Sequence, residues 1–186
     1  MGTESVRYRT IGKMGSGVYR DKGSRFLGFA MSVSGVEDAM RMVREYRKED
    51  GDARHVCWAY VTDEGERWVD DGEPNGTAGV MIGGVLRSSG LENVLCVVVR
   101  YFGGTLLGVG GLRTAYKESA RLAVEDSEKV ERTRTERRVV EASAADAARM
   151  LKRVYELKER GAARVISEVW GEDGGVKWEL DVERGQ

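Results

Sequence analysis

The chain has 186 residues, of which 41% are hydrophobic and 33% charged, so it can bury a core in one or two domains. Its 30 basic and 31 acidic residues leave a formal charge of −1, which excludes a global positive charge as the basis for binding nucleic acid. Two cysteines and no long apolar stretch exclude a disulfide framework and a membrane-spanning helix. Because no signal-peptide pattern opens the sequence, we expect a cytoplasmic protein with no membrane partner.

The N-terminal part alternates between strand and helix patterns. Residues 8–20 mix β-forming residues with glycines and predict edge strands. Residues 23–33 predict a firmer strand with side chains alternating between two faces. Ser34 and Glu37 then form a capping box, and the apolar spacing predicts a helix that ends at about Lys48.

A polar turn at residues 70–77 follows two predicted strands, residues 55–61 and 67–69. It begins a helix predicted for residues 77–88, whose three glycines each cost about 1 kcal/mol against alanine and indicate close packing. The candidate site residues of the turn are Asp70, Asp71, Glu73, Gly76 and Thr77. The carboxylates suit a hard cation such as Mg²⁺ held with phosphate, or arginines and backbone amides of the fold itself. The glycine-led helix start is a second potential anion site.

The central stretch runs from a buried strand, residues 94–99, through a glycine-rich loop into a helix. Glycines let backbone N–H groups approach a ligand closely, and a helix N-terminus carries partial positive charge, so this order suits anion binding. The candidate residues here are Arg100, Tyr101, Phe102, Gly103, Gly104, Gly108, Gly110, Gly111 and Arg113, with Arg25 and His55 added from the earlier strands. The sequence completes neither the dinucleotide-binding nor the P-loop fingerprint. The alternative to anion binding is that the glycines only allow a tight turn.

The chain after residue 125 changes in composition. Residues 126–134 are dominated by charge and predict a linker between an N-terminal domain, residues 1–125, and a C-terminal domain, residues 135–186. The C-terminal residues predict a βαββ pattern in which a helix covers one face of a small antiparallel sheet. The fold class expected for the whole chain is therefore α+β.

Few side chains in this sequence suit catalysis. His55 is the only histidine, and no second ligand pair completes a zinc site with Cys57. We therefore expect no metal, no other cofactor and no catalytic residue. A nucleophilic pairing of His55 with Cys57 or Cys96 would require contact, and the alternative is that both cysteines are buried as small apolar side chains.

Several of these motifs together resemble the YigZ/IMPACT family of ancient cytoplasmic proteins. The resemblance lies in residues 23–26, 55–60, 70–79, 99–104, 107–112 and 115–116, which occur in the family's order within about residues 22–124. Leu106 stands where the family usually has a lysine, which lowers the attraction expected between the loop and an anion.

The resemblance implies an N-terminal β-α sandwich similar to the second domain of ribosomal protein S five. It also implies a C-terminal ferredoxin-like domain similar to a late domain of elongation factor G. Because both folds recur in translation proteins, it further implies RNA, the ribosome or a translation-associated protein as the partner. We expect a monomer.

Three functional hypotheses remain open on these residues. The first is a non-enzymatic protein that regulates translation by binding nucleic acid, the ribosome or a translation factor through the glycine loop. The second is an enzyme for a small phosphate ligand, with His55 as acid or base and Asp71 or Glu73 as the orienting carboxylate. The third is a protein-interaction module with a broad apolar patch.

Overall fold

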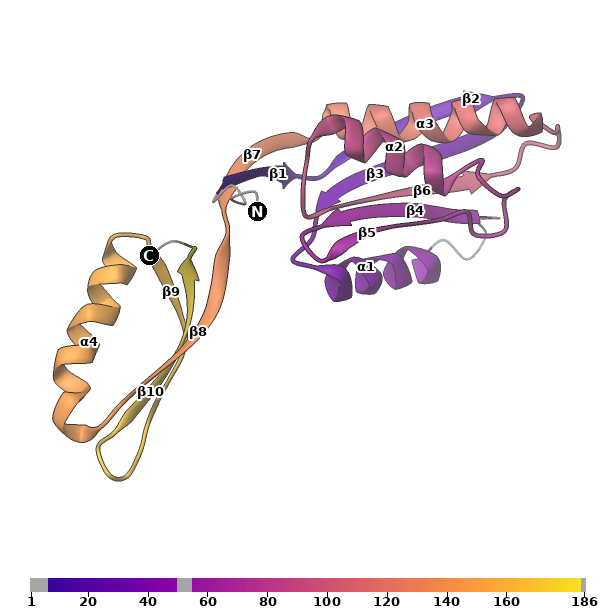
Figure 1. The fold of residues 1–186 in the computed structure, drawn as a ribbon. Coiled ribbons are helices and arrows are strands. Elements are labelled where there is room, and N and C mark those ends of the chain that lie inside the picture. Colours follow the sequence, from indigo (N-terminus) through magenta and orange to yellow (C-terminus); the bar gives the residue numbers. More distant parts are fainter. Residues whose placement is uncertain (1–6, 50–54, 185–186) are drawn as a thin grey trace. The chain divides into compact units, whose positions relative to one another are not determined.

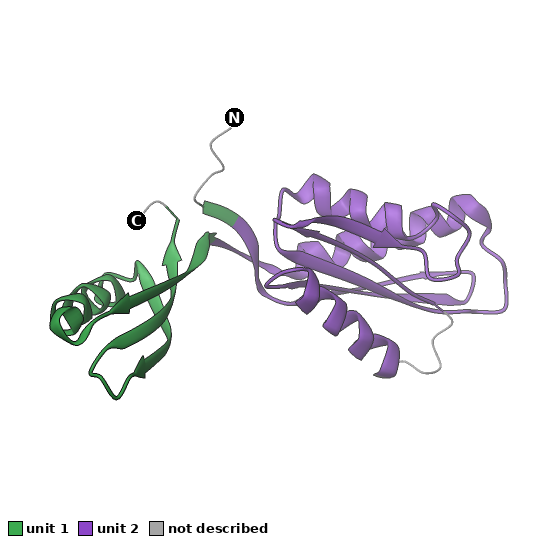
Figure 2. Ribbon diagram, turned by 60° about the horizontal axis from the view of Figure 1, so that its bottom comes forward, with its two compact units in different colours: residues 1–8, 132–186 green, residues 9–131 purple. Residues whose placement is uncertain are grey.

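The computed structural model describes residues 7–49 and 55–184 (Figure 1). Its fourteen described elements run in the order β1 Arg7–Lys13, β2 Gly15–Asp21, β3 Ser24–Ser32, α1 Val36–Glu49, β4 His55–Thr62, β5 Gly65–Val69, α2 Gly79–Ser89, β6 Val94–Tyr101, α3 Gly108–Asp126, β7 Glu128–Thr133, β8 Thr135–Ala142, α4 Ala144–Glu159, β9 Ala163–Trp170 and β10 Val176–Glu183. They form two compact units, residues 9–131 and residues 132–186 with the chain start through Tyr8 (Figure 2). The α+β class is thus confirmed.

The N-terminal unit is built on an antiparallel sheet with strand order β2-β3-β6-β4-β5. Helix α1 covers one face, and α2 and α3 cover the other (Figure 1). Residues 94–99 of the central strand β6 are fully buried, because Val94, Cys96 and Val98 face the α2–α3 layer while the residues between them face α1. The continuous apolar run in the sequence reflects this two-sided burial.

Glycines in β2 and β3 let α3 lie close to the sheet. A Cβ atom added at Gly15, Gly17 or Gly28 would collide with the backbone or Cβ atoms of α3 between Ser119 and Ser127. Small residues on α3, including Ala120 and Ala123, complete the contact from the helix side. The pattern therefore sets the spacing between the helix and the sheet.

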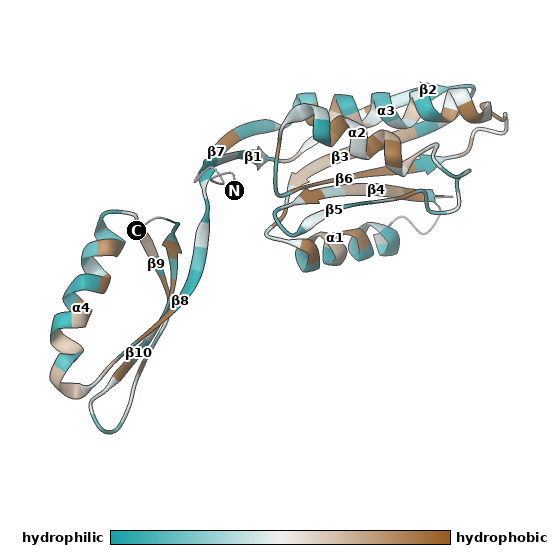
Figure 3. Cartoon of the chain, in the orientation of Figure 1, coloured by the Kyte–Doolittle hydropathy of each residue, from teal (hydrophilic) through white to brown (hydrophobic). Residues whose placement is uncertain are grey.

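Residues 126–134, expected to be a linker, are structured instead. Helix α3 extends to Asp126, and β7 pairs with β1 in a separate two-stranded sheet. The charged residues of β7 are exposed, and Figure 3 colours most of this strand as hydrophilic. Their charge therefore does not oppose strand pairing. A Cβ atom added at Gly12 would lie 2.7 Å from a methyl carbon of Val130, so this glycine allows close contact between the two strands.

The C-terminal unit is a βαββ motif. Its antiparallel sheet has the order β8-β10-β9, with a register shift between Glu179 and Leu180, and α4 packs on one face. Trp178 and Leu180 of the middle strand form the centre of the core. No helix in the described part of the chain is long and apolar enough to cross a membrane.

Candidate anion-binding site

The polar turn before α2 is held by the carboxylate of Asp70. Asp71 and Gly72 have positive φ values of 46° and 84°, and the Glu73 amide donates to the Asp70 carbonyl at 3.0 Å, which closes a tight turn. The Asp70 carboxylate then accepts from the amides of Gly76 (2.9 Å), Ala78 (2.9 Å) and Gly79 (2.8 Å). The protein's own carboxylate therefore occupies the position where an anion would bind at the start of α2.

Thr77, the other candidate of this turn, also has an internal partner. Its hydroxyl donates to the carbonyl of Pro74 at 2.6 Å. The helix begins at Gly79 rather than at residue 77, because residues 76–78 belong to the turn that Asp70 closes.

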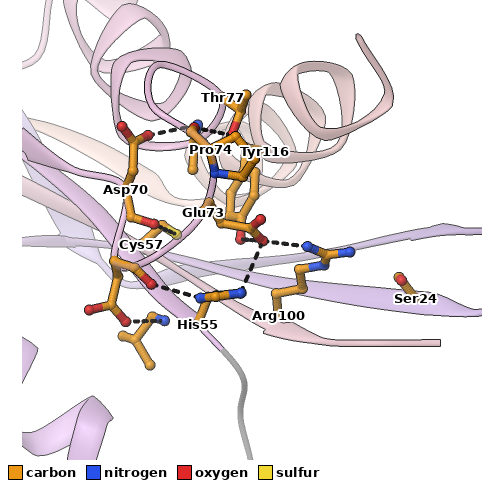
Figure 4. Close-up of polar contacts among 12 residues, drawn as sticks. Ser24, His55, Cys57, Asp70, Glu73, Pro74, Thr77, Arg100 and Tyr116 are labelled. Atoms are coloured by element: carbon orange, nitrogen blue, oxygen red, sulfur yellow. Dashed lines mark hydrogen bonds and ion pairs between the residues drawn. The ribbon is translucent and has the colours of Figure 1, made fainter. Parts of the chain in front are cut away.

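A buried polar cluster joins this turn to β4, β6 and α3 (Figure 4). Glu73 Oε1 accepts from Arg100 Nη1 at 2.5 Å and from the Tyr116 hydroxyl at 2.8 Å. The side chains of Glu73 and Arg100 are only 3% and 6% exposed. His55 Nδ1 lies 2.7 Å from the Asp71 carbonyl, and its Nε2 lies 3.9 Å from Glu73 Oε1.

This cluster neutralises charge inside the protein rather than at its surface. Arg100 was expected to bind an external anion, but its guanidinium is paired with Glu73 and closed off from water. Burial raises the pKa of the Tyr116 phenol, which keeps its proton available for Glu73. The carboxylate of Asp71 is also engaged, by the Val56 amide at 2.8 Å and by Arg47.

The groups considered for catalysis are therefore all in structural contacts. Cys57 donates to the Asp70 carbonyl at 3.0 Å, and burial raises the pKa of its thiol. Burial raises the pKa of the Cys96 thiol to about 12. Both cysteines are thus protonated near neutral pH, where a thiol is a poor nucleophile. Among the described residues, no group of His, Cys, Asp and Glu is placed to hold a metal ion.

The glycine loop after β6 is attached to the β2–β3 hairpin. The Gly103 amide donates to the Ser24 hydroxyl at 3.1 Å, and a Cβ atom at Gly103 would collide with the Gly23 backbone. Gly104 and Gly108 have positive φ values of 86° and 75°, and their surroundings are open. These conformations carry the chain from the strand end into α3.

The start of α3 is open, unlike the start of α2. Its N-cap residue, Leu107, has no side-chain acceptor, and its first turn, residues 108–111, contains no acidic residue. Gly108 and Gly110 are exposed there, while Gly111 packs on Leu107. Arg113, in the second turn, is exposed and donates through Nε to the Gly76 carbonyl at 3.2 Å, which links this helix to the polar turn.

A basic hollow of about 490 Å³ lies beside this loop. Its lining residues are Arg20, Asp21, Lys22, Gly23, Ser24, Arg25, Tyr101 and Phe102. We call these residues the basic hollow. The β2–β3 turn, the end of β6 and the start of α3 all lie at the same end of the unit (Figure 1).

The cations of the basic hollow are aligned by the strand register. Arg20 is directly opposite Arg25, and Arg25 is directly opposite Tyr101. Within residues 7–49 and 55–184, neither these two arginines nor Lys22 forms an ion pair. Sequence reasoning selected Arg25, Tyr101 and Phe102 but missed Arg20 and Lys22. The dipeptide Lys22-Gly23, read as a two-residue hairpin turn, would have placed Arg20 opposite Arg25.

The fold and these contacts define a two-unit α+β protein whose N-terminal unit carries a closed polar turn and an open glycine loop. Residues 22–124 match the model of the Impact N-terminal domain family, so the chain belongs to this family. This confirms the resemblance drawn from the sequence motifs.

Two curated relatives are similar to part of this chain. An IMPACT family member of Haemophilus influenzae is 43% identical over 120 residues, which cover 60% of this chain and 58% of that protein. The IMPACT family member YigZ of Escherichia coli is 46% identical over 100 residues, covering 51% of this chain and 49% of YigZ. The chain thus spans about half the length of the curated relatives it matches.

A solved structure extends the similarity to nearly the whole chain. It is described as the crystal structure of an hypothetical protein, with a TM-score of 0.77 and 28% identity. The match covers 96% of this chain and 86% of that one.

Proposed function

We propose that this protein binds RNA through the basic hollow and the neighbouring start of α3, and that it acts as a non-catalytic regulator in translation. The translation context is what the family resemblance implies. The RNA ligand is supported by the chemistry of the hollow, where cations and aromatic rings occur together.

The observation that carries the proposal is the facing pair Arg20 and Arg25. Like charges directly opposite each other on neighbouring strands destabilise a sheet. Many other surface arginines of the chain, such as Arg41 and Arg121, have carboxylate partners, whereas these two have none in the described residues. A phosphate bridging the two guanidinium groups would remove the repulsion and form charge-assisted hydrogen bonds.

The contrast between the two helix starts supports the same ligand. At α2 the carboxylate of Asp70 accepts from the Ala78 and Gly79 amides, whereas the N-cap residue of α3, Leu107, has no side-chain acceptor. The residues of the first α3 turn, 108–110, are exposed, so a phosphate oxygen can approach their amides. Catalysis by His55 with Asp71 or Glu73 would require these side chains to leave their internal partners.

Binding to RNA at several salt concentrations tests the proposal. We expect the variant Arg20→Gln/Arg25→Gln to bind a fluorescently labelled single-stranded RNA at least about tenfold more weakly. We also expect its log–log salt dependence to become shallower by about 1.4, because each lost phosphate contact removes about 0.7. Fluorescence anisotropy measures both quantities, and ribosome sedimentation at low salt extends the test to a translation partner.

The matched control is Arg44→Gln/Lys48→Gln on the exposed side of α1, which removes the same charge from the same unit. If both double variants lower the affinity equally, net charge rather than the basic hollow determines binding. Equal binding by the wild type and the Arg20/Arg25 variant contradicts the proposal.

A further inference from the structure

The two aromatic rings of the basic hollow have different surroundings. Tyr101 packs against the core layer under α1, and the guanidinium carbon of Arg25 lies 4.9 Å from its ring centroid. Phe102 is 39% exposed, the largest exposure of an aromatic residue among the lining residues of the hollow. Phe102 is therefore the more exposed of the two rings that line the hollow.

The Phe102 ring is also held in place by its contact with Arg100. The guanidinium carbon of Arg100 lies 5.6 Å from the ring centroid, a cation–π distance, and Arg100 is itself fixed by Glu73. On the other side in sequence, Gly103 is attached to Ser24. A ring positioned in this way loses little conformational freedom when a ligand stacks on it.

We infer that the ligand is single-stranded RNA with one unpaired base stacked on Phe102, an inference that rests on the proposed function. A base inside a duplex is already stacked on its neighbours and its faces are closed to a side chain, whereas the face of an unpaired base is open to an aromatic ring. The phosphates flanking this base would lie on Arg20, Lys22 and Arg25, which line the same hollow. Stacking does not depend on base identity, so the site binds single strands with little sequence preference.

Three ligands with the same number of nucleotides per strand test the inference on the full chain. They are a single-stranded RNA, its blunt duplex, and a strand of the same length with abasic residues at every position. We expect the single strand to bind at least about fivefold more tightly than either of the others, because one stacked base contributes about 1–3 kcal/mol. A 2-aminopurine in the single strand should lose fluorescence when it stacks on the protein.

Variants at Phe102 separate stacking from charge. Phe102→Leu keeps an apolar side chain but removes the ring, so it should weaken binding of the single strand about fivefold or more while leaving the salt slope unchanged. Phe102→Tyr should restore tight binding. Thermal unfolding of each variant checks that the fold is intact.

The outcomes of the two proposals are distinguishable. If Phe102→Leu and the abasic strand bind like their parents, while Arg20→Gln/Arg25→Gln still weakens binding, the stacked base is refuted and RNA binding stands. If the arginine variant also binds like the wild type, the proposed function itself fails.

Discussion

At the scale of single residues, the contacts of the polar turn distinguish between two roles for its carboxylates, cation binding and pairing with an arginine. Sequence reasoning allowed Glu73 either to hold a cation or to receive an arginine. In the structure it receives Arg100 and Tyr116, which lie 27 and 43 residues away in sequence. Contacts over such separations depend on strand register and helix placement, so the sequence pattern could not decide between the two.

The first prediction concerns this buried pair. Replacing Glu73 with glutamine leaves the charge of Arg100 buried without a counter-charge, so the free energy of unfolding should fall by about 3–5 kcal/mol. Urea unfolding of the purified variant measures the change. The matched control is Glu66→Gln, which removes an exposed partner of Arg87 and should cost less than about 1 kcal/mol. A similar small loss in both variants would mean that the buried pair does not stabilise the unit.

At the scale of elements, the glycines of α2 differ although the sequence presents them as one group. A Cβ atom at Gly79 would lie 2.6 Å from the Val69 backbone nitrogen, so this glycine lets the helix approach β5. A Cβ atom at Gly83 would make ordinary contact with Trp68, and one at Gly84 would meet nothing within 4 Å. The close packing inferred from the sequence therefore holds at the helix start and not at Gly84.

The second prediction follows from this difference. Gly84→Ala should raise the free energy of unfolding by about 0.5–1 kcal/mol, because alanine favours the helix and nothing opposes its methyl group. Gly79→Ala should lower the stability, because the methyl group would force α2 away from β5. Thermal and urea unfolding of both variants provide the comparison. The packing argument is wrong if the two substitutions shift stability in the same direction.

The periodic elements could be predicted from the sequence, and β7 could not. Residues 94–99 and the helix after the glycine loop have strong apolar patterns, which the structure confirms as β6 and α3. Strand β7 has little apolar periodicity, and its partner β1 is more than a hundred residues away. Its charged composition therefore indicated a linker, although a distant strand pairs with it.

At the scale of the whole molecule, the basic hollow was the part of the site least visible in the sequence. It forms only because β2, β3 and β6 lie side by side in one register, which brings Arg20, Arg25 and Tyr101 into a row. The two-domain α+β layering was predictable from periodicity and family resemblance. The row of side chains depended on which strands become neighbours.

The C-terminal unit should have its own response to acid. Burial raises the pKa of the Asp181 carboxyl, but hydrogen bonds from Arg137 (2.8 Å) and Arg164 (3.1 Å) lower it by more than burial raises it. The pKa of this carboxyl in the folded protein therefore lies below its ordinary value. A lowered pKa in the folded state means that the stabilising contribution is complete above the unfolded value of about 4. It is lost as the pH falls through the folded value.

The third prediction is that Asp181→Asn lowers the stability of this unit at pH 7 and that the difference from wild type shrinks as the pH falls below about 4. Urea unfolding at a series of pH values, followed by NMR resonances of residues 135–184, measures it. Glu159→Gln, at the exposed end of α4, serves as the control for loss of a surface carboxylate and should change the stability at pH 7 by less than about 0.5 kcal/mol. A stability difference that persists undiminished at low pH would exclude the carboxylate as its source.

The two-stranded ladder of β1 and β7 has a practical consequence for anyone who shortens this chain. Trimming the N-terminus past Lys13 would strip β7 of its only neighbour in that sheet and leave a row of unsatisfied amides and carbonyls. An exposed strand edge promotes pairing with another copy, so a truncated preparation would self-associate more than the intact protein, in which β1 covers one edge of β7.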